Sequence, residues 1–267
     1  MDREFLKDKR KIVVKVGTSS LTYANGRLNF QRIERLAMII SNIRNSGRQI
    51  CLVTSGAIAV GSGRMGLDEK PATIALKQAM AAIGQAELMK IYQKFFDEYD
   101  QMIAQVLLTK DVMINPVRKK NARNTLNTLL DMNIVPIINE NDTVATDEIE
   151  FGDNDTLSAY VAALIQADLL IILSDIDGLY TANPRTNPDA KIIHVVQSIT
   201  PEIEEIASGK GSSFATGGMV TKIAAAKICY DCGADMVIAS GQEAGIIFEI
   251  LNGKELGTLF LSKLKQN

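Results

Sequence analysis

Short apolar runs recur along the chain and alternate with segments that have the pattern of helices. The apolar runs are predicted as strands at residues 12–16, 50–54, 102–108, 134–138, 169–173, 235–239 and 258–261. The helices are predicted at residues 30–46, 73–99, 121–133, 156–166 and 218–232. Strands that are apolar on both faces are typical of a parallel sheet covered by helices on both sides. The alternation therefore predicts an α/β fold, a three-layer sandwich around a central, mainly parallel sheet.

The length of 267 residues allows one large domain or two small ones. The motifs are spread from Lys15 to Phe260, with no linker or repeat between them. We therefore expect a single domain over residues 1–267. The Gly-, Pro- and Asn-rich stretch at residues 175–194 is predicted as a long surface loop and not as a domain boundary.

Composition and charge exclude several classes of protein. The net charge of −2 argues against a broad nucleic-acid or anionic-membrane surface, and no apolar run reaches the roughly 18 residues of a membrane span. We expect neither a nucleic acid nor a membrane as a partner. Three cysteines, an odd number, fit a reducing cytoplasm better than a disulfide framework. His194 is the only histidine, so a Ser-His-Asp hydrolase or a histidine-built metal site would depend on that residue alone.

Two short motifs lack the context that their usual function requires. Residues 61–66 match G-x-G-x-x-G, but the dinucleotide fingerprint needs these glycines directly after a strand, and the predicted strand ends at residue 54. We interpret residues 61–66 as a mobile glycine-rich loop. Cys229 and Cys232 form C-x-x-C at the carboxyl end of a helix, where the dipole disfavours a thiolate, and no second pair completes a zinc site. Both are interpreted as small buried side chains, and His194 as a structural residue.

Polar or glycine-rich segments follow several predicted strands or precede predicted helices. In parallel α/β sheets, ligands bind at the carboxyl ends of the strands, in the loops that follow. Six such segments occur, at residues 15–19, 54–57, 139–143, 152–155, 174–180 and 216–222. We expect them to form the functional site.

Two of these segments have the composition of phosphate sites. Lys15 ends an apolar strand and is followed by Gly17 and hydroxyl side chains, which combines a point charge with accessible backbone N–H groups. Gly217 and Gly218 open a helix with Lys222 in its first turn, so the backbone, the helix dipole and the side chain all favour an anion. The alternatives are a lysine extended along a strand edge and a flexible loop entering a helix.

Three other segments offer hydroxyl, amide and carboxylate groups. Ser55 and Gly56 form a turn whose N–H groups could hold a carboxylate or phosphate, or could simply reverse the chain. Residues 139–143 and 152–155 place Asn and Asp side chains after a strand and before a helix. Helix capping accounts for one or two of them but not for all. These groups could hold an ammonium group, orient the lysines or approach a hydrated Mg²⁺.

The combination of charges points to one class of reaction. Two lysines lie in separate phosphate-friendly turns with acidic and amide loops between them, and neither a P-loop motif nor a histidine base accompanies them. These groups suit phosphoryl transfer to an acceptor that needs no deprotonation. A carboxylate, with a pKa of about 4, is already ionised at neutral pH. Catalysis then consists of positioning the reactants and neutralising charge on the phosphoryl group.

At these segments the sequence resembles the amino acid kinase family. The resemblance rests on VVKVGTSSLT at 13–22, VTSGAIAVG at 53–61, IVPIINENDTV at 134–144, FGDNDTLSA at 151–159, SDIDGLYTANPRTNP at 174–188, TGGMVTK at 216–222 and GTLF at 257–260. It covers almost the whole chain, and the pair INENDTV and GDNDTLSA is its most specific part. This pair is similar to the branch that phosphorylates glutamate and separates the chain from the carbamate, uridylate, acetylglutamate and aspartate kinases.

The resemblance implies ATP-dependent phosphorylation of the γ-carboxylate of L-glutamate, the first step of proline biosynthesis, with Mg²⁺ held largely by the ATP phosphates and water. The implied catalytic residues are Lys15, Lys222 and Asp155, the last orienting the two lysines. The implied ATP site comprises Lys15, Ser174, Asp175, Thr216, Gly217, Gly218, Met219, Val220, Thr221 and Lys222. The implied substrate site comprises Ser55, Gly56, Ala57, Asn139, Asp142, Asp153 and Asn154. The resemblance names no protein ligand for the metal ion.

Further family properties follow from the same resemblance. Many members continue past the GTLF motif into a PUA domain, whereas this sequence ends seven residues after Phe260; we expect no PUA domain. Feedback inhibition by proline, a homo-oligomer and delivery of the product to a glutamyl phosphate reductase are expected. Two alternatives stay open: a sibling kinase with another acidic acceptor, and a non-catalytic amino-acid or nucleotide sensor on the same fold.

Overall fold

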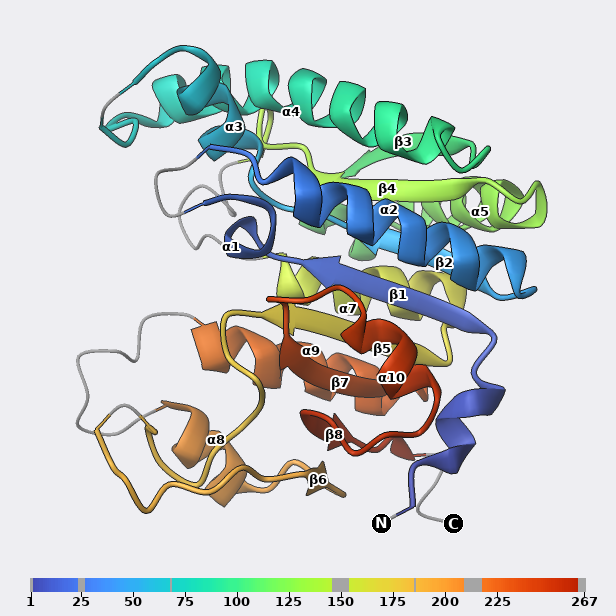
Figure 1. Ribbon diagram of the computed structural model, residues 1–267, viewed down its shortest axis with the longest axis vertical. Coiled ribbons are helices and arrows are strands. Elements are labelled where there is room, and N and C mark those ends of the chain that lie inside the picture. The colour runs from blue at the N-terminus through green and yellow to red at the C-terminus, as the bar shows by residue number, and fades with distance from the viewer. Residues whose placement is uncertain are drawn as a thin grey trace.

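A computed structural model describes residues 2–23, 27–67, 69–145, 154–184, 186–208 and 218–263. Within these residues, one eight-stranded sheet has the order β3-β4-β2-β1-β5-β7-β8-β6 (Figure 1). The strands are β1 (Lys11–Val16), β2 (Gln49–Val53), β3 (Ile103–Leu108), β4 (Val135–Glu140), β5 (Leu169–Ser174), β6 (Val195–Val196), β7 (Asp235–Ser240) and β8 (Thr258–Phe260). All the strand pairs are parallel except β7 with β8, which is antiparallel.

Strand β1 lies between the two halves of the sheet. It pairs with β2 on one side and with β5 on the other, with Lys15 opposite Val53 and Ile172. The chain builds β2, β3 and β4 on one side of β1 and then crosses to β5 and β7 on the other. In parallel sheets, a ligand crevice opens where the strand order reverses in this way. The carboxyl end of β1 is therefore where the topology itself predicts a site.

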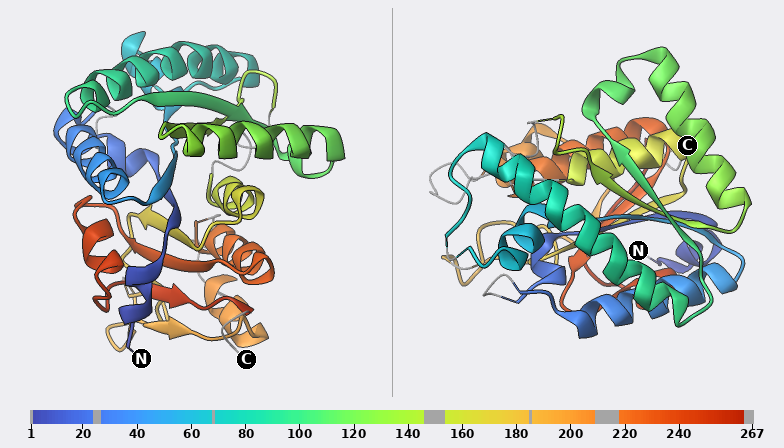
Figure 2. Two further views of the ribbon diagram at one scale, coloured as in Figure 1. Left: turned by 90° about the vertical axis from the view of Figure 1, so that its right-hand side faces the viewer. Right: turned by 90° about the horizontal axis from the view of Figure 1, so that it is seen from above.

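Helices cover both faces of the sheet (Figure 2). They are α1 (Thr18–Leu21), α2 (Phe30–Asn45), α3 (Ala57–Arg64), α4 (Ile74–Asp97), α5 (Pro116–Asp131), α7 (Asp155–Ile165), α8 (Pro201–Ser208), α9 (Gly218–Cys232) and α10 (Ile246–Leu251), with short 3-10 helices η1 (Glu4–Asp8) and η2 (Lys110–Met113). Buried residues of α2, α4 and α10 form a core on one face, and those of α5, α7 and α9 form a core on the other. None of the described helices is both long and apolar enough to cross a bilayer.

Local sequence starts the long helices where the structure has them. The Asn29 side chain accepts a hydrogen bond from the Arg32 N–H at the start of α2, and Thr73 accepts one from Leu76 at the start of α4. Asn115 caps α5, whose first residue, a proline, needs no hydrogen bond at its nitrogen. The cap and the proline begin α5 at residue 116, five residues before the predicted start.

The predicted fold class is confirmed, and all seven predicted strands are present. Strand β6 was not expected, because two residues carry too little pattern to predict a strand. The interpretation of residues 61–66 as a mobile loop is wrong for its first part. Gly61 to Arg64 form the last turn of α3, whose glycines conceal a helix from a composition-based prediction. Residues 175–194 lie mostly in turns and irregular structure, as predicted.

Candidate active site

The carboxyl ends of β1, β2, β4 and β5 meet at one edge of the sheet, on the left in Figure 1 beside α1 and the start of α9. Parallel pairing forces this arrangement, because strands that run in the same direction end on the same side. The segments that follow these strands begin with Gly17, Thr54, Asn141 and Asp175. The expectation that these polar segments form one site therefore agrees with the topology.

Two buried lysines share one buried carboxylate at this edge. Lys15 Nζ lies 2.6 Å from Asp155 Oδ1, and Lys222 Nζ lies 2.9 Å from Asp155 Oδ2. Asp155 is fully buried, and each lysine is 6% exposed. Lys222 also donates to the Gly218 carbonyl at 3.0 Å, and the Thr221 hydroxyl donates to Asp155 Oδ2 at 3.2 Å. The carboxylate thus holds both ammonium groups at fixed positions, one at each oxygen.

Three separate elements supply this cluster. Lys15 lies on β1 between Val14 and Val16, whose side chains belong to the core under α2, so the alternation of a strand turns Lys15 towards α7. Asp155 is the first residue of α7, and Lys222 lies in the second turn of α9, which packs against α7. The three charged groups together carry one net positive charge. A buried cationic cluster of this kind favours a phosphate group beside it.

A chain of amide side chains lies next to the charged cluster. Asn154 Nδ2 donates to the Thr54 carbonyl and to Asn139 Oδ1, each at 2.7 Å, and Ser55 Oγ lies 3.1 Å from the same nitrogen. Asn154 is fully buried and Asn139 is 1% exposed. Since Asn154 directly precedes Asp155, the start of α7 carries one residue of the amide cluster and one of the charged cluster. The structure thereby brings together residues that are up to 100 positions apart.

Helix capping does not account for Asn154. The residue occupies the N-cap position of α7, but its side chain makes no capping hydrogen bond. The amide donates instead to the turn after β2, and the Asn154 Oδ1 atom is buried without a hydrogen-bond partner in the described part of the chain. Buried polar atoms are normally paired, so this oxygen is available to a ligand donor. Asn154 is therefore among the residues of this segment that capping does not explain, and a role in binding is favoured.

Asp142 is a second buried acceptor in the same region. It is 5% exposed, and among the described residues its Oδ1 atom has no hydrogen-bond partner. Burial raises the pKa of Asp142 to about 6, because a desolvated carboxylate is disfavoured relative to the acid. A ligand ammonium group would offset that cost.

Glycines shape the two turns that flank the cluster. Gly56 has φ of +98°, which an L side chain rarely adopts, and it leads directly into α3 at Ala57. A Cβ atom on Gly17 would lie 3.8 Å from Lys15 Nζ, so a side chain there would project over the ammonium group. The missing side chain leaves room for a phosphate group beside the lysine.

A glycine contact also brings α3 against α4. A Cβ atom on Gly84 would lie 1.7 Å from the Ala57 carbonyl oxygen, and one on Gly61 would lie 2.0 Å from the Met80 carbonyl oxygen. The two helices therefore touch backbone to backbone. Gly61, the first glycine of the G-x-G-x-x-G match, serves helix packing in this structure.

The remaining predicted site residues lie at the same edge or outside the described chain. Ser174 is buried and donates to Asp175 Oδ1 at 3.1 Å, whereas Asp175 is exposed. Gly218, Met219 and Val220 form the first turn of α9. Asp153, Thr216 and Gly217 lie outside the residues that the structure describes.

Sequence reasoning missed Gln85 of α4. Its Oε1 accepts a hydrogen bond from Asn139 Nδ2 at 2.9 Å, which joins α4 to the amide cluster. Its neighbours on the buried side of α4 are Ala81, Leu88 and Tyr92, at helical spacing. The helical period predicts an apolar residue at position 85. A polar amide there is the signal that could have identified Gln85 as a site residue.

The excluded motifs lie away from this cluster or lack its chemistry. Cys229 is buried as predicted, whereas Cys232 is exposed, so the interpretation of Cys232 as buried is wrong. Desolvation still raises the pKa of both thiols, so neither is an activated nucleophile. The His194 carbonyl accepts a hydrogen bond from Arg3, and its ring lies 3.9 Å from Glu255, at the β6 and β8 side of the sheet. Among the described residues, no group of three or more His, Cys, Asp or Glu side chains could hold a metal ion.

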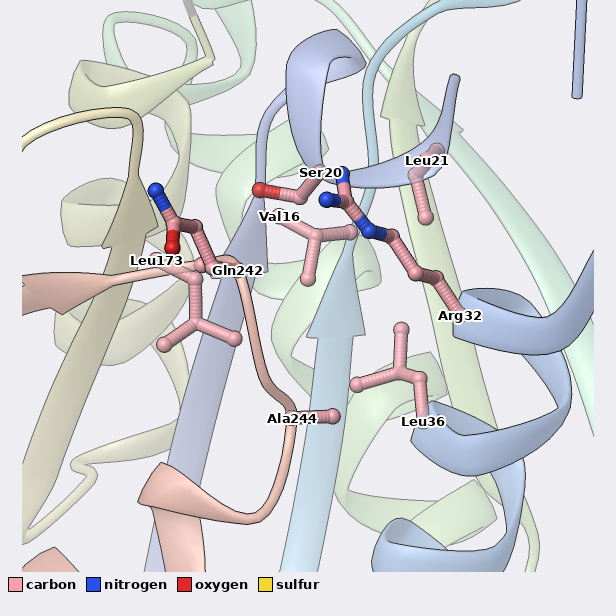
Figure 3. Close-up of a pocket in the computed structure, with 9 residues that line it drawn as sticks. Val16, Ser20, Leu21, Arg32, Leu36, Leu173, Gln242 and Ala244 are labelled. Atoms are coloured by element: carbon pink, nitrogen blue, oxygen red, sulfur yellow. The ribbon is translucent and has the colours of Figure 1, made fainter. Parts of the chain in front are cut away.

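A small pocket lies on the opposite face of the sheet from Lys15 (Figure 3). Arg32 of α2 extends across it towards Ser20, and Gln242 approaches from the segment after β7. The nine lining residues are Val16, Ser20, Leu21, Arg32, Leu36, Leu173, Gly241, Gln242 and Ala244. Because Val16 and Leu173 belong to the core under α2, the pocket is separate from the lysine cluster.

Comparison with known proteins agrees with this architecture. Residues 10–240 match the model of the amino acid kinase family. A carbamate kinase from Giardia lamblia, solved with bound AMP-PNP, has the same fold, with a TM-score of 0.68 at 16% identity over 96% of this chain and 100% of its own. The chain belongs to the amino acid kinase family.

Within that family, relatives of similar length are named glutamate 5-kinase. The protein from Clostridium perfringens is 56% identical over 265 residues, which cover 98% of this chain and 98% of its own. The protein from Listeria monocytogenes serovar 1/2a is 52% identical over 268 residues, which cover 99% of this chain and 97% of its own.

Proposed function

We propose that the chain has glutamate 5-kinase activity: it transfers the γ-phosphoryl group of ATP to the γ-carboxylate of L-glutamate. The product is L-glutamyl 5-phosphate, and the reaction is the first step of proline biosynthesis. The observation that carries the proposal is the pair of buried lysines held on the two oxygens of Asp155, beside a buried amide and carboxylate cluster. The names of the relatives at 52–56% identity support the same activity.

The chemistry needs no general base. The γ-carboxylate of glutamate is ionised at neutral pH, so one of its oxygens can attack the γ-phosphorus directly. A bond forms between this oxygen and phosphorus, and the bond between phosphorus and the β,γ-bridging oxygen breaks, which leaves ADP. Two anions must approach each other in this step. Lys15 and Lys222 offset the repulsion between them and stabilise the negative charge on the moving group.

Asp155 acts on the two lysines and not on the substrate in this mechanism. Each of its oxygens accepts from one ammonium group, so the carboxylate fixes the distance between the two charges before the substrates bind. Such preorganisation avoids reorganising the charges during the reaction. The nucleotide would lie against Lys15, Ser174, Asp175 and residues 216–222. Glutamate would lie against Ser55, Gly56, Ala57, Asn139, Asp142, Asp153 and Asn154.

The residues at the strand ends suit the phosphates of a nucleoside triphosphate better than they suit a metal ion held by protein ligands alone. The glycine turn after β1 leaves open space next to the Lys15 ammonium group, and the helix α9 begins beside Lys222. The described residues offer no cluster of three carboxylate, histidine or cysteine ligands. We propose that Mg²⁺ enters with the ATP phosphates and neutralises part of their charge. Asp175 is exposed at this edge and could contact the hydrated ion.

A hydroxamate assay tests the proposal. Hydroxylamine traps an acyl phosphate as a stable hydroxamate, and we expect product only when ATP, Mg²⁺ and glutamate are all present. Aspartate and acetylglutamate are assayed in parallel to test the sibling kinases. Lys222→Ala and Lys15→Ala should each lower kcat by about 100-fold or more, the scale of one lost contact to transition-state charge. Folded wild-type protein without glutamate-dependent turnover would refute the activity.

Proline inhibition and assembly belong to the same proposal. Proline is an α-amino acid, so it would compete for the groups that bind the amino-acid end of glutamate, and millimolar proline should inhibit most strongly at low glutamate. Exposed apolar side chains on or near the edge strand β3 support a homo-oligomer, among them Met102 (64% exposed), Ile114 (84%) and Val117 (67%). Light scattering after size-exclusion chromatography measures its mass.

The remaining expectations concern the context of the reaction. We propose a single kinase domain over residues 1–267, since relatives of nearly equal length match over 97–98% of their own chains. Free cysteines at positions 51, 229 and 232 support a cytoplasmic location. Because acyl phosphates hydrolyse readily, a glutamyl phosphate reductase is the partner expected to consume the product.

A further inference from the structure

One buried amide at the site has an unused hydrogen-bond donor. Gln85 of α4 is 9% exposed, and its Oε1 accepts from Asn139. Its Nε2 atom is buried and has no hydrogen-bond partner within the described residues. A buried amide nitrogen without an acceptor is costly, so such groups are typically completed by water or by a ligand. Gln85 belongs to none of the segments that carry the family motifs.

The backbone fixes the orientation of every amide in the cluster. The Glu140 N–H donates to Asn139 Oδ1 at 3.0 Å, and the Thr54 carbonyl accepts from Asn154 Nδ2 at 2.7 Å. A backbone N–H can only donate and a carbonyl can only accept, so neither asparagine can be turned over. Asn139 must then present its NH₂ group to Gln85. Gln85 must present its oxygen to Asn139, which leaves its own NH₂ group for another acceptor.

Close helix packing holds Gln85 in place. Its neighbour Gly84 touches the Ala57 carbonyl so closely that a Cβ atom would lie 1.7 Å from it. The same contact fixes α4 relative to the turn formed by Ser55, Gly56 and Ala57. The Gln85 amide therefore has little freedom to move away from the cluster.

The unpaired groups match the polar end of an α-amino acid. Asp142 Oδ1 and Asn154 Oδ1 are buried acceptors without hydrogen-bond partners in the described chain, and Gln85 Nε2 is a buried donor without one. An α-amino acid carries an ammonium group, which only donates, and a carboxylate, which only accepts. The two acceptors suit the ammonium group, and the donor suits the carboxylate.

The sheet order gives the substrate its direction. The γ-carboxylate must lie near Lys15 on β1, where the phosphoryl group is transferred. Asn139, which holds Gln85, lies near the carboxyl end of β4, and β2 separates β4 from β1. Strands are about 4.8 Å apart, so β4 lies roughly 10 Å from the lysine strand, and Gln85 contacts the site from the β4 side. That separation suits the far end of an extended glutamate molecule.

We propose that Gln85 is a further substrate-binding residue, whose Nε2 donates to the α-carboxylate of glutamate while its Oε1 holds Asn139 in position. The inference rests on the proposed function and deepens it. It assigns to α4 the recognition of the group that distinguishes an α-amino acid from a simple carboxylic acid.

Two substrates and three variants test the assignment. 4-Aminobutyrate keeps the amine and the phosphorylated carboxylate of glutamate but lacks the α-carboxylate. Gln85→Met removes the donor with little change in volume, and it should lower kcat/KM for glutamate by about 10- to 100-fold, the scale of a hydrogen bond to a charged group. The same variant also removes the oxygen that accepts from Asn139, so kcat/KM for 4-aminobutyrate should fall too, but by a clearly smaller factor than for glutamate, since that substrate offers nothing for Nε2 to bind.

The second variant separates binding from folding. Gln85→Glu keeps an oxygen that can accept from Asn139 but places a negative charge against the α-carboxylate, so it should raise KM for glutamate and leave KM for ATP unchanged. Gln93→Met is the matched control, because Gln93 is exposed on the same helix and makes its hydrogen bond to Asp97. It should behave as wild type. Thermal unfolding of all variants confirms that they fold.

The possible results distinguish the inference from the activity on which it rests. Equal losses for glutamate and 4-aminobutyrate in Gln85→Met, or an unchanged glutamate KM in both Gln85 variants, would overturn the role of Gln85 and leave the kinase activity intact. Wild-type protein that does not turn over glutamate would overturn the proposed function and this inference together.

Discussion

Helices α3 and α4 touch at Gly84, so the substitution Gly84→Ala tests whether this contact positions the turn at the substrate site. In Gly84→Ala the new Cβ atom would lie 1.7 Å from the Ala57 carbonyl oxygen and 2.5 Å from the Gly61 nitrogen, both of them backbone atoms. Contacts of Cβ atoms shorter than 3.0 Å are essentially never seen, so α3 must retreat from α4 by about 1.5 Å.

The change in the free energy of unfolding is the difference between two opposing effects. Overpacking costs about 1–3 kcal/mol, and a 1.7 Å contact with backbone belongs to the upper part of that range, about 2–3 kcal/mol, whereas replacing glycine by alanine inside a helix gains about 1 kcal/mol. We expect a net loss of about 1–2 kcal/mol in the free energy of unfolding. For a chain of this size that corresponds to a decrease in Tm of about 2–8 °C.

The effect on activity should exceed the effect on stability. Helix α3 has eight residues, and its first residue, Ala57, belongs to the turn that we assign to the substrate. A displacement of about 1 Å at a reacting group costs about 100-fold in rate. We expect kcat/KM for glutamate to fall by about 10- to 100-fold, with a much smaller change in KM for ATP.

Glutamate and ATP titrations in the hydroxamate assay, together with thermal unfolding, measure these quantities. Gly245→Ala is the control, because a Cβ atom there meets nothing within 4 Å and φ is −56°. It should retain wild-type Tm and kinetics. A Gly84→Ala enzyme with wild-type Tm and wild-type KM for glutamate would show that α3 and the turn are not held by this contact.

Two further predictions concern the buried carboxylates. Asp155→Asn leaves two ammonium groups buried without the carboxylate charge that held them, so the free energy of unfolding should fall by about 3–5 kcal/mol and kcat by at least about 100-fold. Chemical denaturation measures the first quantity and the hydroxamate assay measures the second. A fully active and equally stable variant would contradict the role assigned to Asp155. Asp142 has a pKa of about 6 and should bind the substrate ammonium group only when ionised. KM for glutamate should therefore be constant well above pH 6 and rise about 10-fold per unit below it, whereas Asp142→Asn should have a high KM that does not follow this profile.

The strands were predictable because their signal is local. Residues 12–16 and 169–173 are apolar or nearly so, and they lie on β1 and β5, where helices cover both faces. The same reasoning located Lys15 and Asn139, since polar residues that end or follow such strands must lie at the edge of the sheet.

The parts that could not be predicted depend on contacts between distant segments. Residues 57–64 contain two glycines and therefore have a weak helical signal, and α3 forms because it packs against α4. The resemblance implied Asn154 as a substrate-site residue, but a sequence cannot say that the Thr54 carbonyl is within reach of its amide. Gln85 lay within an apolar helix, and its partner Asn139 is 54 residues away.

The sequence separation of these contacts has a consequence for how the chain acquires its activity. Asn154 reaches Thr54 across 100 residues, Lys222 reaches Asp155 across 67, and Gln85 reaches Asn139 across 54. Closing such long loops comes late and slowly in folding, because the entropy of each loop is lost before its contacts are gained. A nascent or fragmented chain that lacks either half of the sheet therefore contains only part of the site: without the segments after β5 it lacks Lys222, and without β2 to β4 it lacks Gln85 and Asn139. Catalytic activity should return only with the last step of refolding, and its recovery is a direct report on completion of the whole sheet.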